Sequence, residues 1–307
     1  MSTRPSVGVV IPTRDRPGLL RQALASVLAQ EYSGRVRVAV VYDGCEPDPT
    51  LAARGARHVE VLGNDRTPGL SGARNTGILA LSDVDLVAFC DDDDRWLPGK
   101  LAAQVAALGQ HPGSEFATCG IEVEYEGVVR QRLAGTDVVI LDDLVRSRMA
   151  MLHASTFLVR RSVLAHKDGL GLVAEDAPGS QNEDYDLLIR AARRAPITHV
   201  DLPLIRVLWG RTSYFAHQYR SKIESLRWML DRHPELLTDR PGAARMYAQL
   251  ACWHAANGER RTALHWARAA FRCHWREPRT AIAVAAAAHL VSVETVLSTL
   301  HKRGHGI

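Results

Sequence analysis

The chain has 307 residues, of which 46% are hydrophobic and 23% charged, with 38 Lys and Arg against 34 Asp and Glu. This composition excludes an intrinsically disordered chain, a collagen and a disulfide scaffold, and it leaves one or two globular domains open. The five cysteines are scattered without a C-x-x-C pair, and no basic segment followed by an apolar run opens the chain, so we expect a cytoplasmic location.

Short β-branched runs alternate with helical stretches at the start of the chain. These runs are VGVVI at 7–11, VRVAVV at 36–41, HVEVL at 58–62 and LVAFC at 86–90. Continuous apolar strands separated by helices predict an α/β fold in which helices cover both faces of a parallel sheet. Such sheets bind ligands where the strands end, so the polar residues that follow each strand are the first candidates for a site.

The pattern changes after residue 115, where EFATCGIEVEYEGVVRQRL alternates like a hairpin with Gly127 at its turn. Two later runs, STFLVRRSVL and ITHVDLPLIRVLW, predict further strands in a mixed sheet on the same core. Beyond Tyr214 the strand signals stop and helical patterns follow, broken at His233-Pro234, Asn257-Gly258 and Pro278. We therefore predict a catalytic domain over 1–216 and an α-helical module over 217–307.

Four consecutive aspartates, Asp91 to Asp94, follow the strand that ends at Cys90. Like charges this close repel one another unless a cation neutralises them. Mg²⁺ and Mn²⁺ fit, because hard cations prefer carboxylate oxygens and leave positions free for phosphate oxygens. The alternative is a solvated acidic turn that favours the start of the next helix through its dipole.

Five segments carry recognisable motifs, and they are VGVVIPTRDRPGLLRQALASVLAQ, VVYDG, GLSGARNTGILAL, FCDDDDRWLPGKL and NEDYDLLIR. Their order and spacing resemble the inverting family 2 glycosyltransferases. The resemblance covers about the first two thirds of the chain and leaves the basic tail outside. It implies a GT-A fold, a Rossmann-like mixed sheet flanked by helices, and transfer of a sugar from a nucleotide diphosphate donor.

The resemblance also assigns the nucleotide side of the site. Pro12, Thr13 and Arg14 would border the base, Asp43 would bind uracil or ribose, and Arg74 would lie on the same side. A UDP-sugar is the expected donor, although guanosine and thymidine donors stay open.

The acidic cluster would hold the metal ion that bridges the two phosphates of the donor. The resemblance implies that Asp91 lies near the ribose and that Asp93 is the main ligand of Mn²⁺ or Mg²⁺, with Asp92 and Asp94 in support.

The segment GSQNEDYDLLIRAARR predicts a helix in which Ser180 and Glu183 form a capping box. Asp184 would then lie in the first turn, where the helix dipole favours the ionised carboxylate that a base requires. The resemblance implies that Asp184 deprotonates the acceptor while direct displacement inverts the anomeric centre. The alternative is that Asp184 only complements the dipole.

The acceptor side departs from the family pattern. Tyr42 replaces the first of two usual acids, no histidine follows Arg206, and HKDGLGLVAEDAPGSQ replaces the usual glycine-aromatic-aspartate stretch. Candidate acceptor contacts are His153, Glu183 and Trp209, and a glycan, a lipid-linked compound and a natural product all remain open as acceptors.

The tail 217–307 holds 14 basic and 7 acidic residues, and its arginines alternate with Trp266, Phe271 and Trp275. This pattern fits a peripheral contact with the inner face of the membrane, a homodimer interface, or packing on the catalytic domain. The alanine-rich segment that follows is too weakly apolar to span a membrane. No nucleic-acid recognition motif accompanies the charge, so nucleic acid is not an expected partner.

Two other functions are compatible with the same pattern. A sugar nucleotidyltransferase also uses acidic metal ligands on an α/β sheet, but it needs a glycine-rich phosphate loop that IPTRDRP does not supply. A catalytically silent scaffold that presents the tail to a partner would tolerate loss of the base, and Asp184 argues against it.

Overall fold

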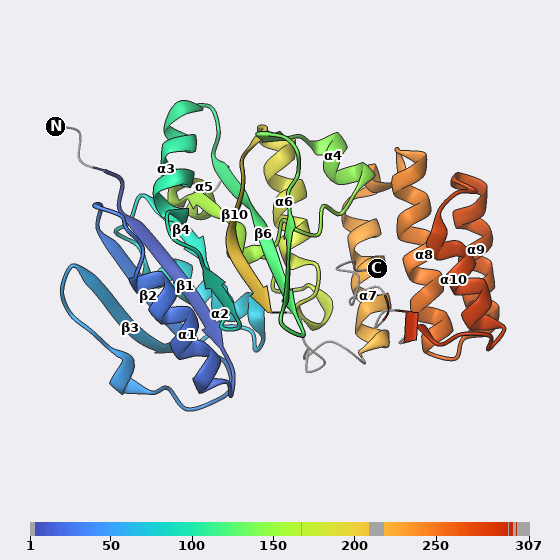
Figure 1. The fold of residues 1–307 in the computed structure, drawn as a ribbon, viewed down its shortest axis with the longest axis horizontal. Helices are drawn as coiled ribbons and strands as arrows, with labels where there is room; N and C mark the ends of the chain where they lie inside the picture. Colours follow the sequence, from blue (N-terminus) through green and yellow to red (C-terminus); the bar gives the residue numbers. More distant parts are fainter. Residues whose placement is uncertain (1–3, 167, 209–217, 294, 297–298, 300–307) are drawn as a thin grey trace.

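The computed structural model describes residues 4–166, 168–208, 218–293, 295–296 and 299. Over these residues the chain forms one ten-stranded mixed sheet flanked by helices, with further helices at one end (Figure 1). The predicted α/β fold with C-terminal helices is therefore confirmed.

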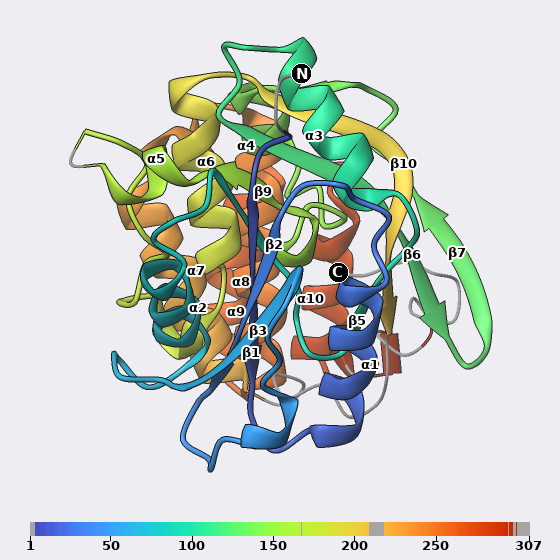
Figure 2. The same cartoon turned by 90° about the vertical axis from the view of Figure 1, so that its left-hand side faces the viewer.

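The N-terminal strands set the position of the site. β1 (Val7–Thr13) pairs in parallel with β2 (Val36–Tyr42) on one side and with β4 (Leu86–Phe89) on the other, and β3 (Arg57–Gly63) pairs in parallel with β2. The chain thus adds strands outward from β1 to β3 and then returns to the opposite side of β1 (Figure 2). This reversal opens a crevice at the carboxyl ends of β1 and β4, which is where open α/β sheets bind ligands.

The remaining strands make the sheet mixed. β9 (Leu158–Arg160) runs antiparallel to β4 and to β6 (Phe116–Tyr125), and β10 (Ile197–Leu208) runs parallel to β6 and antiparallel to β5 (Asp94–Trp96).

The predicted hairpin is confirmed by β7 (Val128–Arg132), which pairs antiparallel with β6. Its turn consists of Glu126 and Gly127, with φ values of 48° and 79°. β10 also pairs at its start with the short β8 (Val138–Val139).

Two layers of helices cover the sheet. α1 (Pro17–Leu28) and α3 (Lys100–Gln110) bury their apolar faces on one side, whereas α2 (Leu70–Ala80) and α6 (Glu183–Arg194) pack on the other. The close approach of α2 to β1 depends on Gly77, because a Cβ atom there would lie 2.4 Å from the Val10 side chain. α4 (Leu141–Arg146) and α5 (Arg161–Ala165) connect the later strands.

The structure corrects the predicted start of α6. The capping box of Ser180 and Glu183 is wrong, because the helix begins at Glu183 and Asn182 precedes it with a left-handed φ of 62°. Ser180 belongs to the short 3₁₀ turn Pro178–Ser180 and also has a positive φ of 49°. These two left-handed residues turn the chain away from the path that a capping box needs. Asp184 still lies in the first turn of the helix.

Helices separated by the predicted breaks make up the described residues from 219 to 287. They are α7 (Tyr219–Arg232), α8 (Arg240–Ala256), α9 (Arg260–Cys273) and α10 (Pro278–Ala287). α7 and α8 contribute Ile223 and Met246 to the core on the α2 side of the sheet, and α9 and α10 pack on α8. No helix in the described ranges is long and apolar enough to cross a membrane. The predicted domain boundary at 216 lies outside the described residues, so it stays a prediction.

Candidate functional site

A cavity of about 630 Å³ opens at the carboxyl ends of β1 and β2. Pro12, Thr13 and Arg14 line it from the end of β1, and Asp43 lines it from the end of β2. The N-terminus of α2 and the turn before α6 close the opposite wall. The structure thus brings four of the residues that were assigned to the nucleotide side into one cavity.

Asp43 is buried and its carboxylate is held in place by the chain around it. Its Oδ1 accepts hydrogen bonds from Asn64 Nδ2 at 2.8 Å and from the backbone N–H of Gly69 at 2.9 Å. Arg14 Nη1 lies 3.8 Å from Oδ2. The second carboxylate oxygen therefore points toward the part of the cavity where Arg14 lies, with its orientation fixed by the bonds to the first.

Two members of the acidic cluster are tied to the cavity wall. Asp92 accepts a hydrogen bond from Thr13 Oγ1 at 2.7 Å, and Arg16 pairs with Asp92 at 2.5 Å and with Asp93 at 2.6 Å. Burial raises the pKa of Asp92 to about 6, although Thr13 and Arg16 act in the opposite direction. Asp93 is 38% exposed. Arg16 therefore neutralises one side of the cluster.

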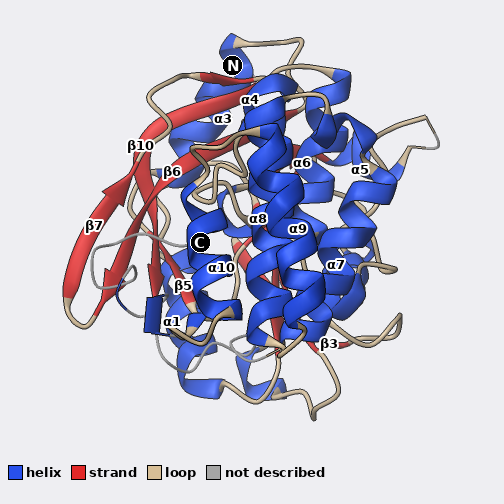
Figure 3. Ribbon diagram, turned by 90° about the vertical axis from the view of Figure 1, so that its right-hand side faces the viewer, coloured by secondary structure: helices blue, strands red, loops and turns tan. Residues whose placement is uncertain are grey.

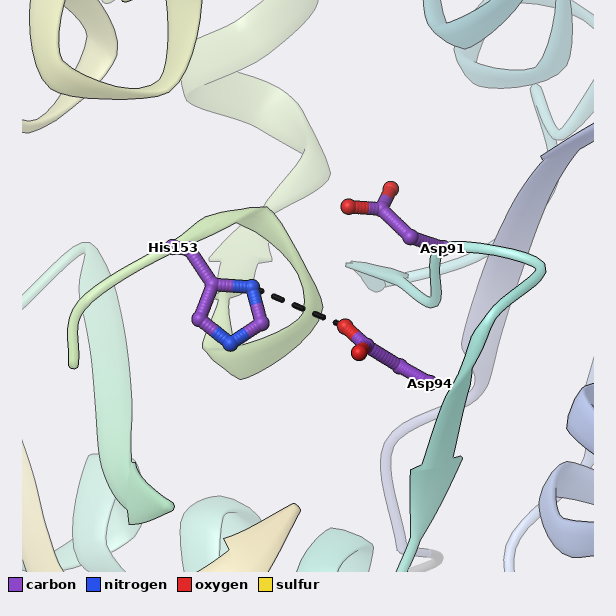
Figure 4. A group of neighbouring side chains, drawn as sticks. All are labelled: Asp91, Asp94 and His153. Carbon is purple, nitrogen blue, oxygen red and sulfur yellow. Dashed lines mark ion pairs between the residues drawn. The ribbon is translucent and has the colours of Figure 1, made fainter. Parts of the chain in front are cut away.

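The other side of the cluster forms a group that could bind a cation (Figure 4). The ligand atoms of Asp91, Asp94 and His153 all lie within 4.8 Å of one another, and His153 Nδ1 lies 3.6 Å from Asp94 Oδ2. Burial and the charge of Asp91 raise the pKa of Asp94 well above its usual value. Burial lowers the pKa of His153, which favours the neutral imidazole that binds metals.

Asp93, the metal ligand implied by the resemblance, is not part of this group. Its carboxylate pairs with Arg16 instead. The assignment of Asp93 as the main metal ligand stays a prediction.

Arg74 links the acidic cluster to the start of α6. Its side chain is only 2% exposed and contacts Asp91 at 2.6 Å through Nη2 and Glu183 through Nη1. Burial opposes ionisation of Asp91, but Arg74 outweighs it and holds the pKa of Asp91 below its usual value. Burial raises the pKa of Glu183 to about 7 against the effect of Arg74. Arg74 therefore compensates the buried Glu183 and the partly exposed Asp91, which lie far apart in the sequence.

Asp184, the predicted base, lies beside this pair. Arg74, Glu183 and Asp184 line one small recess together with Phe89 and with Phe157. The Asp184 side chain is 15% exposed, and its Oδ2 accepts a hydrogen bond from Arg148 Nη2 at 2.7 Å. A carboxylate at the first turn of α6 is thus kept in one orientation close to the acidic cluster.

Comparison with known proteins identifies the family. Residues 8–166, more than half of the chain, match the family described as "Glycosyl transferase family 2". The chain belongs to glycosyl transferase family 2.

This family 2 chain is similar to the succinoglycan biosynthesis protein ExoW of Rhizobium meliloti (strain 1021), with 43% identity over 193 residues. The match covers 55% of this chain and 60% of ExoW. The chain thus spans less than two thirds of the length of the first curated relatives that it matches.

Solved structures share the fold of this family 2 chain. S. aureus TarS 1-349 in complex with UDP-GlcNAc has a TM-score of 0.61 at 16% identity, over 98% of this chain and 92% of that one. The mannosyltransferase PcManGT from Pyrobaculum calidifontis, in complex with GDP-Man and Mn²⁺, has a TM-score of 0.56 at 17% identity, over 97% and 84% of the two chains. The predicted GT-A fold is confirmed.

Sequence reasoning missed two arginines of the family 2 site. Arg16 lies in the quoted segment TRDRP, two residues after Arg14, and its position beyond the strand end could have marked it. Arg148 lies between α4 and β9 with no motif around it, so its contact with Asp184 had no sequence signal. Trp209, a candidate acceptor contact, lies outside the described residues.

Proposed function

We propose that this chain transfers a sugar from a nucleoside diphosphate donor to an acceptor nucleophile, with inversion at the anomeric carbon and with Asp184 as the general base. One observation carries the proposal. Thr13 and Arg16 line the cavity and bind the acidic cluster, and Arg74 connects that cluster to the helix turn that holds Asp184.

The donor is a UDP-sugar in this proposal. The cavity has room for a nucleotide, and Asp43 presents an acceptor oxygen to the imide N–H of uracil or to a ribose hydroxyl. The UDP-GlcNAc bound by TarS supports this choice. The GDP-Man bound by PcManGT makes guanosine the alternative base to test.

The proposal includes a divalent cation, Mn²⁺ or Mg²⁺. Asp91, Asp94 and His153 would hold it, and two carboxylates with a neutral imidazole suit Mn²⁺ in particular. His153 turns its Nδ1 toward Asp94 Oδ2 at 3.6 Å, so Nδ1 would be the nitrogen that binds the cation (Figure 4). When bound, the cation stabilises charge on the departing nucleoside diphosphate. Asp93 is the alternative ligand.

The chain itself supplies the proton acceptor and its orientation. Asp184 would take the proton from the acceptor nucleophile as it attacks the face opposite the diphosphate, which inverts the anomeric centre. Arg148 would fix the carboxylate through its hydrogen bond to Oδ2. Arg74 would keep Asp91 and Glu183 in place, so Glu183 serves the site through Arg74.

The acceptor would approach from the α6 side of the site, next to Asp184. We propose a carbohydrate, lipid-linked or small-molecule acceptor, with the protein at the inner face of the membrane for a lipid-linked one. His153 lies beside Asp94 and Glu183 pairs with Arg74, so their contacts with the acceptor stay predictions of the sequence.

The test is release of nucleoside diphosphate from a panel of UDP- and GDP-sugars with Mn²⁺. We expect UDP release, and we expect Asp184→Asn to lower the rate about 10²–10⁴-fold, about 3–5 kcal/mol of barrier. UDP should still raise the melting temperature of the variant, because ligand binding stabilises the native state. The matched control is Asp231→Asn, an exposed aspartate of α7.

Three outcomes would contradict the proposal. Near-normal transfer by Asp184→Asn would remove the base assignment. Pyrophosphate release would indicate nucleotidyl transfer, and the absence of both products with every donor would indicate a scaffold.

Two isosteric variants distinguish the cation ligands. Asp94→Asn should raise the Mn²⁺ concentration that gives half-maximal UDP release about tenfold or more, because a direct ligand contributes at least as much to metal affinity as the groups around it. Asp93→Asn, at an exposed carboxylate that pairs with Arg16, should change it less. The opposite ranking would assign the ion to Asp93.

A further inference from the structure

The outer surface of α9 carries large apolar side chains that the fold does not cover. α9 packs on α8 through small residues, since Ala263, Ala267 and Ala270 are buried, and it lies at the end of the molecule opposite β3 (Figures 1 and 3). The outward Leu264 and Phe271 are 48% and 59% exposed. An inner face of alanines therefore leaves the larger apolar groups of this helix on the surface.

These apolar residues alternate with arginines along one face. Arg261, Leu264, Arg268 and Phe271 are spaced by three, four and three residues, which aligns them on one side of a helix. Trp275, four residues further and just beyond the helix end, is 64% exposed. We call these five residues the α9 stripe.

Arg261 and Arg268 give the α9 stripe a positive charge. Among the described residues, Arg261 and Arg268 form no ion pair. The neighbouring acids are engaged elsewhere, since Glu259 contacts His254 and Glu277 contacts Arg279. The stripe therefore offers both unpaired basic groups and accessible aromatic surface.

We infer that the α9 stripe docks on the surface of an anionic lipid bilayer. Arginines attract acidic headgroups, while Trp and Phe on the apolar face of an interfacial helix insert where headgroups meet acyl chains. A second copy fits less well, because a symmetric contact would bring the same arginines of two chains together. This docking does not require the proposed sugar transfer, and neither depends on the other for its test.

The test is co-sedimentation of the full chain with vesicles. Vesicles of phosphatidylcholine with about 30 mol% phosphatidylglycerol should bind the protein, and pure phosphatidylcholine should bind it about tenfold less. Binding should weaken as NaCl rises from about 0.05 to 0.5 M, because salt screens exposed charges. Arg268→Glu combined with Phe271→Ser should reduce binding about tenfold.

The matched control changes the same residue classes on β7, with Arg130→Glu combined with Val128→Ser, both exposed. It should bind vesicles like the unaltered chain. Melting curves report whether each variant folds, and Trp275→Ser, outside the helix, serves as the second variant. Equal binding to both vesicle types, or equal loss in the control, would overturn the inference. So would a dimer in light scattering that the stripe variant dissociates.

Discussion

Replacing Arg74 by methionine tests whether the buried charge network holds the site together. The substitution keeps an unbranched apolar stem but removes the guanidinium that contacts Asp91 and Glu183. Arg74 is 2% exposed and Glu183 is 6% exposed at the side chain. Glu183 would then be buried without the guanidinium that balances its charge, and Asp91, which is 25% exposed, would lose the same partner.

Breaking a buried ion pair by removing one partner costs about 3–5 kcal/mol. Unfolding entropy is about 2.1 cal/mol/K per residue, which gives about 0.6 kcal/mol/K for a chain of this length. The melting temperature should therefore fall by about 5–8 °C at neutral pH.

The loss of stability in Arg74→Met should depend on pH. Burial already raises the pKa of Glu183 to about 7 in the folded protein, above its unfolded value, and without Arg74 it would rise further. A carboxyl group whose pKa is raised on folding does not destabilise the protein at a pH below its unfolded pKa. It destabilises the protein most at a pH above its folded pKa. The difference between Arg74→Met and the unaltered chain should thus narrow from pH 8 to pH 5.

Calorimetry of Arg74→Met and of the unaltered chain at several pH values measures the difference in melting temperature, and Arg14→Met is the control. Arg14 has a 52% exposed side chain that lies 3.8 Å from Asp43, so its removal should cost less than about 1 kcal/mol. A melting temperature of Arg74→Met within about 1 °C of the unaltered chain would refute the reasoning, because it would mean that the two acids need no compensating charge.

Two further predictions follow from other contacts. Burial opposes ionisation of Asp186, but a hydrogen bond to His233 at 2.9 Å and two arginines outweigh it and lower the pKa of Asp186 to about 2. Asp186→Asn should therefore cost about 2–3 kcal/mol in urea titrations at neutral pH. The cost should shrink as the pH falls from about 4, the unfolded pKa of an aspartate, to about 2, the folded pKa of Asp186, below which the carboxyl group is protonated in both states. A constant loss at all pH values, or an equal loss in the 63% exposed Asp176→Asn, would contradict this. Arg148→Met should lower kcat about tenfold with little change in the KM for the donor. The reason is that Arg148 contacts Asp184 and does not line the cavity at the ends of β1 and β2. A rise in KM alone would disprove the positioning role.

The sequence alone determined the N-terminal strands and the polar residues that follow them. Apolar runs fixed the N-terminal strands to within two residues, because continuous β-branched stretches are stable only in a buried sheet. The same pattern indicated that Asp43 and Asp91 follow strand ends, and motif order led to the family. These features depend on neighbours within a short stretch of chain.

Only the tertiary structure decided which of those residues meet. Arg74 and Glu183 are 109 positions apart, and Arg148 and Asp184 are 36 apart, yet each pair forms an ion pair. No local pattern encodes such contacts. The first pair arises because α2 and α6 pack on the same face of the sheet, and the second because the chain after α4 lies beside the start of α6. The tertiary structure also decided which side of α9 is exposed, because α8 packs on its alanine face. Sequence periodicity predicts the faces of a helix but not which element covers each face.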